Sequence, residues 1–205
     1  SIRSYNFLTK SEIEKRLNFK FLKKNILVTF HPETLNKEGT KKNFTSLLNA
    51  LKKLKNTNII FTMPNHDLDS SIIHTLILKF VKKKKDSYFF KSLGQKVYYS
   101  CCKHMDCMVG NSSSGLLEMP SFKKYSINLG DRQKGRIKAA SVIDCKFNSN
   151  EIFTKINYAL NEKNQSKIQS VKNPYGYGGA SKKIASTLKR IKFEKIINKK
   201  FYDII

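Results

Sequence analysis

The sequence predicts an α/β protein, built on a mainly parallel β-sheet with helices on both faces. Three observations support this fold class: short apolar runs of buried-strand type, segments of helical periodicity between them, and polar residues directly after the strands. Strands that alternate with helices at this spacing form βαβ units, whose right-handed crossovers make the strands parallel. Such sheets bind ligands beyond the carboxyl ends of their strands, so the polar residues there form the candidate site.

The predicted strands are short and apolar, as strands buried on both faces of a sheet are. His31-Pro32 follows the first strand, and Pro64 ends the second. Five strands are predicted over Asn25–Phe30, Asn58–Met63, Tyr88–Phe90, Cys107–Val109 and Tyr125–Leu129, and Ser141–Cys145 is a candidate sixth.

Apolar residues spaced three and four apart predict the helices between these strands. In the segment 41–55 the apolar positions are Phe44, Leu47, Leu48, Leu51 and Leu54. The other predicted helices cover 69–84, 95–104, 149–161 and the segment from Ala180 onward, and a short edge helix begins at Ser11.

A polar turn after the fourth strand is the centre of the candidate site. Residues 110–115 contain three serines between two glycines, at the start of a predicted helix. Backbone N–H groups and the positive end of a helix dipole point outward together in such a turn, which favours phosphate. Glu118 follows about a turn and a half into this helix, where its carboxylate would accept hydrogen bonds from a ribose diol. The alternative is that Ser112, Ser113 or Ser114 only caps the helix.

Polar residues follow other strands as well, each with an alternative role. His31 has an ordinary pKa near neutrality and suits proton donation beside a phosphate or sugar; otherwise the loop backbone satisfies it. Asn65 contacts a base or sugar, or shapes the turn after its strand. Arg132 clamps phosphate or stacks near a base, or lies in an exposed basic loop. Lys91 also occupies a strand end.

The formal charge of +25 raises the question of a nucleic-acid partner. Only five of the 40 basic residues are arginine, and the lysines are spread over nearly every predicted element. Surfaces that read bases favour arginine and interleave it with aromatic residues. We therefore expect no specific nucleic-acid partner, although a charge this large favours weak nonspecific binding.

The cysteines and the hydropathy pattern exclude further classes. Cys101, Cys102, Cys107 and Cys145 lack metal-ligand spacing, so we expect reduced core thiols and neither a metal nor a cofactor. No apolar run approaches the roughly 18 residues of a membrane span, and no apolar signal segment is seen at the start. The sequence thus predicts a cytoplasmic protein without a membrane partner.

The glycine-rich segment 173–181 precedes the last predicted helix. It lacks the Gly-Lys-Ser/Thr ending of a P-loop and does not follow a first strand. We interpret it as a closing loop or aromatic lid over the crevice.

Together these motifs resemble the UDP-N-acetylglucosamine 2-epimerases, in particular the hydrolysing branch of sialic and legionaminic acid synthesis. The resemblance extends from about Phe21 to Arg190. The stretches that carry it are Val28–Pro32, Met63–Asn65, Val109–Gly115, Glu118, Ile127–Arg136 and Asn173–Gly176. It covers only the C-terminal half of the family's architecture, the GT-B fold, in which two Rossmann-like lobes face each other across a cleft.

The resemblance implies roles for the site residues. Ser112 and Ser113 would hold the diphosphate, and Glu118 the ribose hydroxyls. Asn65 and Arg132 would line the nucleotide pocket.

A catalytic role is implied for His31, beside the sugar and diphosphate. The family reaction eliminates UDP to give a 2-acetamidoglucal and then adds water with inversion at C2. The products would be UDP and N-acetylmannosamine, or a diacetamido analogue.

The resemblance also implies that this chain needs a partner. The family's acid/base carboxylates lie in an N-terminal lobe to which no stretch here corresponds, and proton abstraction needs a positioned base in an enclosed cleft. We expect the chain alone to bind UDP weakly and to turn over nothing. The expected division is an N-terminal edge helix or linker over 1–24, a Rossmann-like nucleotide-binding lobe over 25–193, and a basic tail over 194–205.

Three alternative functions stay open: a non-hydrolysing 2-epimerase, the donor lobe of a GT-B glycosyltransferase, and a nucleotide- or nucleic-acid-binding module without catalysis. Pro32 and the 131–136 loop favour the hydrolysing branch. The sequence specifies neither the sugar, the base nor an allosteric site, and a homo-oligomer is compatible with it.

Overall fold

The computed structural model describes residues 2, 5–32, 37–64 and 69–191. Its centre is a six-stranded sheet in the order β3-β2-β1-β4-β5-β6, with every neighbouring pair parallel. This is the strand order of doubly wound dinucleotide-binding folds, so the predicted fold class is confirmed. The strands are β1 (Lys24–Thr29), β2 (Thr57–Thr62), β3 (Ser87–Phe90), β4 (Cys107–Gly110), β5 (Tyr125–Leu129) and β6 (Val142–Cys145).

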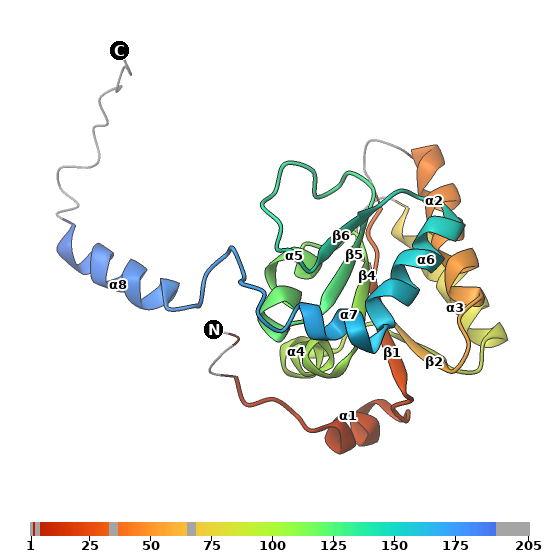
Figure 1. Ribbon diagram of the computed structural model, residues 1–205, viewed down its shortest axis with the longest axis horizontal. Helices are drawn as coiled ribbons and strands as arrows, with labels where there is room; N and C mark the ends of the chain where they lie inside the picture. The colour runs from red at the N-terminus through yellow and green to blue at the C-terminus, as the bar shows by residue number, and fades with distance from the viewer. Residues whose placement is uncertain (1, 3–4, 33–36, 65–68, 192–205) are drawn as a thin grey trace, which may run out of the picture.

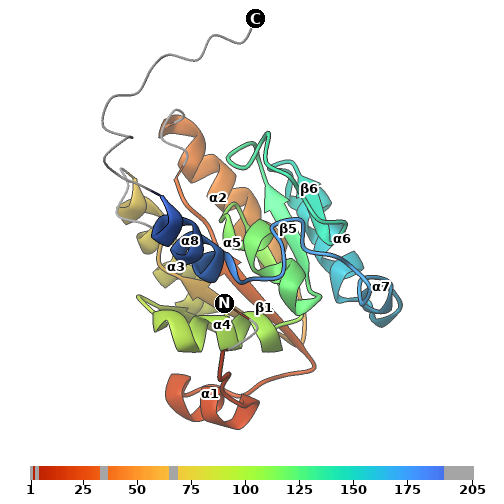
Figure 2. The same cartoon turned by 90° about the vertical axis from the view of Figure 1, so that its left-hand side faces the viewer.

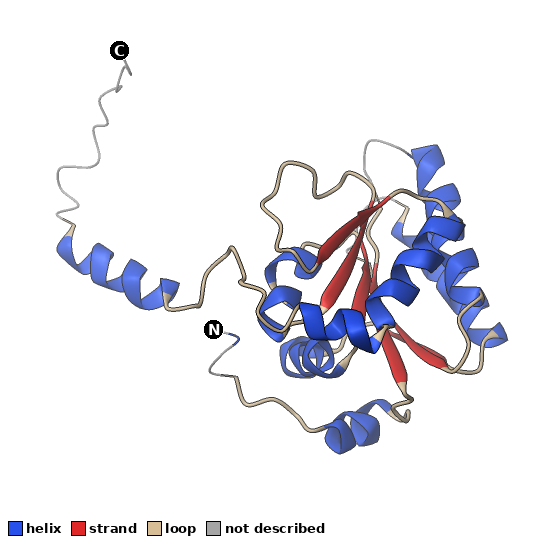
Figure 3. Cartoon of the chain, viewed as in Figure 1, coloured by secondary structure: helices blue, strands red, loops and turns tan. Residues whose placement is uncertain are grey.

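Helices cover both faces of the sheet (Figure 3). Ile26 and Val28 of β1 pack with α2, α3 and α6 in one core, whereas Leu27 packs with α1 and α4 in the other. Successive strand residues point to opposite faces, so burial on both sides explains the unbroken apolar runs. The helices are α1 (Lys10–Leu17), α2 (Lys37–Lys52), α3 (Ser70–Lys83), α4 (Gly94–His104), α5 (Ser114–Leu117), η2 (Met119–Phe122), α6 (Ser149–Leu160), α7 (Glu162–Lys167) and α8 (Ala180–Arg190).

The helix after the serine turn is shorter than the sequence predicts. α5 ends at Leu117, and Glu118 lies at the junction with the 3₁₀ helix η2 instead of within a continuing helix. Pro120 lies in the first turn of η2, where its missing N–H cannot continue the α-helical hydrogen bonds. Glu118 therefore lies where the chain passes from α5 into η2.

The last described helix stands apart from the rest. α8 projects from the body of the molecule in Figure 1, and in Figure 2, where that side faces the viewer, it is drawn in front of the body. Its Ile184 and Leu188 are 58% and 48% exposed. None of the residues of α8 is buried, so its apolar face lies open in this structure.

The glycine-rich loop does not cover the strand ends. Asn173 Nδ2 donates to the carbonyl of Leu117 at 2.8 Å and to Ser121 Oγ at 2.7 Å, and the Tyr175 hydroxyl donates to the carbonyl of Ile137 at 3.0 Å. The loop therefore packs against α5, η2 and the loop after β5. The interpretation as a lid is wrong for this conformation, because these bonds hold Asn173 and Tyr175 and no residue of the segment lines the cleft at the strand ends.

The cysteines are buried free thiols, as predicted. Burial raises the pKa of Cys101 and of Cys145 to about 12, which keeps both thiols protonated and unreactive. Across the described ranges, no helix combines the length and apolarity that crossing a membrane requires.

Candidate functional site

A cleft of about 490 Å³ lies at the carboxyl ends of the strands, beside the point between β1 and β4 where the strand order reverses. Ligands of doubly wound sheets bind at this switch point. The predicted site residues His31, Ser112, Ser113 and Glu118 all line the cleft, although they come from different segments. The other lining residues are Thr29, Thr62, Met63, Lys91, Ser92, Leu93, Gly94, Gln95, Tyr98, Tyr99 and Ser114.

The three serines of the turn have different environments. Ser112 Oγ accepts a 3.3 Å hydrogen bond from the N–H of Ser114, and Ser114 Oγ accepts a 2.6 Å bond from the Tyr98 hydroxyl. Ser113 is the N-cap residue of α5, yet its side chain makes no capping bond. The capping alternative therefore fits Ser112 weakly and Ser113 not at all, which leaves the partly exposed Ser113 hydroxyl facing the cleft.

Gly115 brings the turn close to the sheet. A Cβ at this position would lie 2.3 Å from Ser126 Oγ of β5. The missing side chain thus allows the first residues of α5 to rest on β5 with the turn at the strand end.

Tyr98 of α4 forms part of the floor of the cleft. Burial raises the pKa of its phenol well above the ordinary value, and the nearby Glu118 carboxylate adds to the rise. The hydroxyl therefore stays protonated and donates to Ser114. Sequence reasoning missed this residue because a tyrosine inside an amphipathic helix has the same pattern as a core tyrosine.

His31 lies just beyond β1 and is 7% exposed. Its backbone N–H donates to Asn111 Oδ1 at 2.7 Å, and its carbonyl accepts from Asn111 Nδ2 at 2.9 Å. Asn111 belongs to the Val109–Gly115 stretch, but the sequence pattern does not predict this contact. The side-chain amide of one strand end thus holds the backbone of another.

The remaining predicted residues are placed differently. Asn65 lies outside the described residues. Arg132 is exposed and does not line the cleft; its Nη1 donates to the carbonyl of Asn111 at 3.2 Å. The neighbouring Gln133, which was not predicted, is 2% exposed and donates to the same carbonyl at 2.9 Å. Two side chains of the loop after β5 therefore bond to the backbone at the start of the serine turn.

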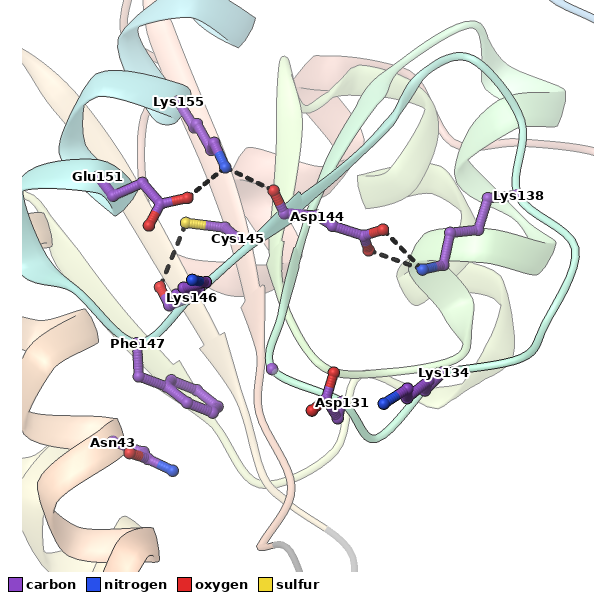
Figure 4. Close-up of a pocket in the computed structure, with 11 residues that line it drawn as sticks. Asn43, Asp131, Lys134, Lys138, Asp144, Cys145, Lys146, Phe147, Glu151 and Lys155 are labelled. Atoms are coloured by element: carbon purple, nitrogen blue, oxygen red, sulfur yellow. Dashed lines mark hydrogen bonds and ion pairs between the residues drawn. The ribbon is translucent and has the colours of Figure 1, made fainter.

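A larger cavity of about 780 Å³ lies beside β6, α6 and α2 (Figure 4). Lys138 forms an ion pair with Asp144, and Lys155 pairs with Glu151 and donates to the Asp144 carbonyl. Partial burial raises the pKa of the Asp144 carboxyl, but hydrogen bonds from Lys138 and Asn128 bring it below its ordinary value overall. Much of this cavity's charge is paired within the protein, and the serine turn does not line it, so the smaller cleft is the better candidate.

No group of three or more His, Cys, Asp or Glu side chains suited to a metal ion occurs within the described ranges. The described residues that line the cleft offer hydroxyls, backbone groups, His31, Lys91 and Glu118.

Comparisons with known proteins identify the family of the chain. The sequence model of the UDP-N-acetylglucosamine 2-epimerase family matches residues 3–189. The chain is 37% identical over 205 residues to the GDP/UDP-N,N'-diacetylbacillosamine 2-epimerase (hydrolyzing) of Campylobacter jejuni, covering 99% of this chain and 53% of the relative. It is 39% identical over 203 residues to the polysialic acid biosynthesis protein P7 of Escherichia coli, covering 98% and 51%.

Solved structures show the same fold. A putative UDP-N-acetylglucosamine 2-epimerase from Listeria monocytogenes has a TM-score of 0.69 at 15% identity, and the match covers 100% of this chain and 53% of that one. The S. aureus MnaA–UDP structure has a TM-score of 0.66 at 18% identity, with coverages of 96% and 52%. The chain thus spans about half the length of its relatives. It belongs to the UDP-N-acetylglucosamine 2-epimerase family.

Proposed function

We propose that this chain is the nucleotide-binding half of a hydrolysing 2-epimerase that acts on a UDP-acetamidosugar, with residues 25–193 as the nucleotide-binding lobe. The observation that carries the proposal is the convergence of the serine turn, Glu118 and His31 on one cleft at the switch point of the sheet. The hydrolysing 2-epimerases among the relatives support the reaction type. UDP and the C2-inverted sugar, of the N-acetylmannosamine type, would be the products.

The residues of the cleft suit the parts of such a substrate. Ser113 and the backbone of the turn would hold the diphosphate, with Lys91 adding positive charge at the rim. Glu118, at the junction of α5 and η2, would accept hydrogen bonds from the ribose hydroxyls. His31 would face the bond between sugar and diphosphate, where a proton donor stabilises the leaving group.

The described residues of the cleft offer no second carboxylate for the other end of the reaction. Glu118 is the sole carboxylate among the described residues that line it. A carboxylate that binds ribose cannot also remove the C2 proton of the sugar, because the base must lie within hydrogen-bond reach of that proton. We therefore propose that the base comes from an N-terminal half like that of the relatives, either in the native chain or in a separate subunit.

Titration with UDP, uridine and 2′-deoxy-UDP tests the two ends of the proposed site. We expect the chain to prefer UDP over uridine and over 2′-deoxy-UDP. Ser113→Ala should reduce the first preference about tenfold or more, and Glu118→Ala the second, because a hydrogen bond to a charged group contributes about 1.5–3 kcal/mol. Calorimetry measures both ratios.

Glu162→Ala provides the control for this titration, since Glu162 is an exposed carboxylate of α7. Its two affinity ratios should match those of the original chain. The proposal fails if Ser113→Ala and Glu118→Ala keep both preferences while the chain still binds UDP.

The exposed apolar residues of α8 lead to a separate prediction, about assembly with an N-terminal half. We propose that Ile184 and Leu188 contact the N-terminal half. Leu188→Asp should weaken association with the separately expressed N-terminal half of the Campylobacter jejuni relative at least tenfold, because it places a carboxylate in an apolar contact. Ser186→Asp, on the opposite side of the helix, should leave the affinity within about twofold. Analytical ultracentrifugation measures both, and equal weakening by the two variants would contradict the docking.

A further inference from the structure

Asn111 joins three neighbouring strand ends. Its side chain forms two hydrogen bonds with the backbone of His31, one in each direction, at 2.7 and 2.9 Å. Its carbonyl accepts from Gln133 Nε2 at 2.9 Å and from Arg132 Nη1 at 3.2 Å. We name these four bonds the Asn111 clasp. They connect the ends of β1, β4 and β5, which are adjacent in the sheet.

The chemistry of the clasp requires an amide. The backbone N–H of His31 needs an acceptor and its carbonyl needs a donor, and asparagine supplies one of each. Aspartate would face the carbonyl with a second acceptor. Asn111 is fully buried (0% exposed), so water cannot replace either bond at low cost.

The backbone before Asn111 is adapted to the same contact. Gly110 has φ +144° and pairs with Thr29 of β1, two residues before His31. A Cβ on Gly110 would lie 1.9 Å from the Thr29 carbonyl oxygen. The absence of a side chain therefore lets β4 end close enough to β1 for a short asparagine to reach the His31 backbone.

The position of Asn111 relates the clasp to the site. Ser112 and Ser113 follow it directly in the chain, so a residue that fixes the backbone of His31 also begins the serine turn. We propose that Asn111 is a positioning residue, which holds His31 in a fixed place relative to the turn that would bind the diphosphate. The proposal rests on the proposed function of the cleft.

Asn25 offers a matched control. At the other end of β1 its Oδ1 accepts from the N–H of Leu22 at 3.0 Å, and its Nδ2 donates to the Leu22 carbonyl at 2.7 Å. This buried amide makes the same pair of backbone bonds, far from the cleft. Asn111→Ala and Asn25→Ala therefore both remove a two-way amide–backbone contact, but only the first involves His31. Asn25→Ala also removes side-chain bonds to Asn58 and Asp106, so it is the more disruptive of the two for the strand that it serves.

Nuclear magnetic resonance of the ¹⁵N-labelled histidine rings separates positioning from stability. At fixed pH, and with the His31 signals assigned by His31→Gln, Asn111→Ala should shift the ring signals of His31. Asn25→Ala should leave them in place, even where thermal unfolding shows similar destabilisation. UDP should shift the His31 ring in the original chain, and Asn111→Ala should reduce that shift by at least half.

A third readout reports the other end of the cleft. Asn111→Ala should keep the preference for UDP over 2′-deoxy-UDP, since Glu118 belongs to a different segment. Unchanged His31 ring signals in Asn111→Ala, or equal shifts in both asparagine variants, would overturn the inference and leave the proposed function standing. If the original chain binds no UDP, the proposed function fails, and the ligand-free ring signals still decide whether Asn111 positions His31.

Discussion

Gly110→Ala is expected to lower the free energy of unfolding by about 3 kcal/mol or more, a large part of the roughly 5–15 kcal/mol that stabilises a typical domain. The new Cβ would lie 1.9 Å from the carbonyl oxygen and 2.7 Å from the carbonyl carbon of Thr29. Both atoms belong to the backbone of a central strand, so neither can move aside as a flexible side chain would. Chemical denaturation monitored by circular dichroism measures the loss.

Gly135→Ala is the control that separates steric clash from backbone strain. Gly135 also has a positive φ, of +80°, but a Cβ there would meet no atom within 4 Å. Its substitution should cost only about 1 kcal/mol, the usual penalty of a left-handed conformation. Similar losses in the two variants would show that the ends of β1 and β4 are not as tightly apposed as described.

The strands could be predicted from the sequence because both faces of the sheet are buried. In β1, Ile26 and Leu27 point to opposite faces and both are fully covered, so the centre of the strand, from Ile26 to Val28, is apolar without interruption. Such a run is short, ends at a turn residue and is separated from the next run by a periodic helix. The local sequence is then sufficient to predict the strand, because all the residues that form the pattern lie close together in the chain.

The site could be predicted only in part, since its chemistry depends on contacts between distant segments. Ser113 and Glu118 lie in one short motif and were found from their spacing. Asn111 acts on a backbone 80 residues away, and Gln133 acts on Asn111. Every residue has the same backbone groups, so a side chain that bonds to one of them requires no particular partner residue. Such contacts therefore leave no recognisable pattern in the sequence.

The length of the helix that follows the serine turn could not be predicted from the sequence either. The helix predicted to run from the serine turn through Glu118 ends after one turn, at Leu117, where Pro120 and the junction with η2 stop it. The predicted neighbours remain close in space, because both Ser113 and Glu118 still line the cleft. Sequence spacing therefore identified the pair of residues more reliably than the backbone that connects them.

The positive charge of the chain is not concentrated in the described part of the cleft. Lysines dominate the composition, yet Lys91 is the only one among the described residues that line the cleft. Strong binding of a diphosphate by charge alone would need several cations close together. The geometry favours directed hydrogen bonds from the turn instead, and this predicts that affinity for UDP depends less on salt than nonspecific binding to polyanions does.

His31→Asn should lower turnover by about 10²- to 10⁴-fold in an enzyme assembled with an N-terminal half, while affinity for UDP stays within a few fold. Asparagine keeps the backbone N–H and carbonyl that Asn111 holds, so the clasp is retained and only the imidazole is lost. An imidazole that stabilises the leaving diphosphate acts mainly in the transition state, so its loss should appear in kcat and not in binding. Release of UDP and of the free sugar from UDP-N-acetylglucosamine or UDP-N,N'-diacetylbacillosamine, at saturating substrate, gives the rate.

His74→Asn is the matched control, because His74 lies on α3 with its ring 5.1 Å from that of Phe89 and does not line the cleft. Its turnover should remain within about twofold of the original, as expected for a substitution away from any special feature. Equal rates for the two histidine variants would remove His31 from the reaction. A His31→Asn variant that loses UDP affinity while its turnover at saturating substrate stays unchanged would instead make His31 a binding residue for the diphosphate, since an interaction made equally in the ground state and the transition state raises KM without lowering kcat.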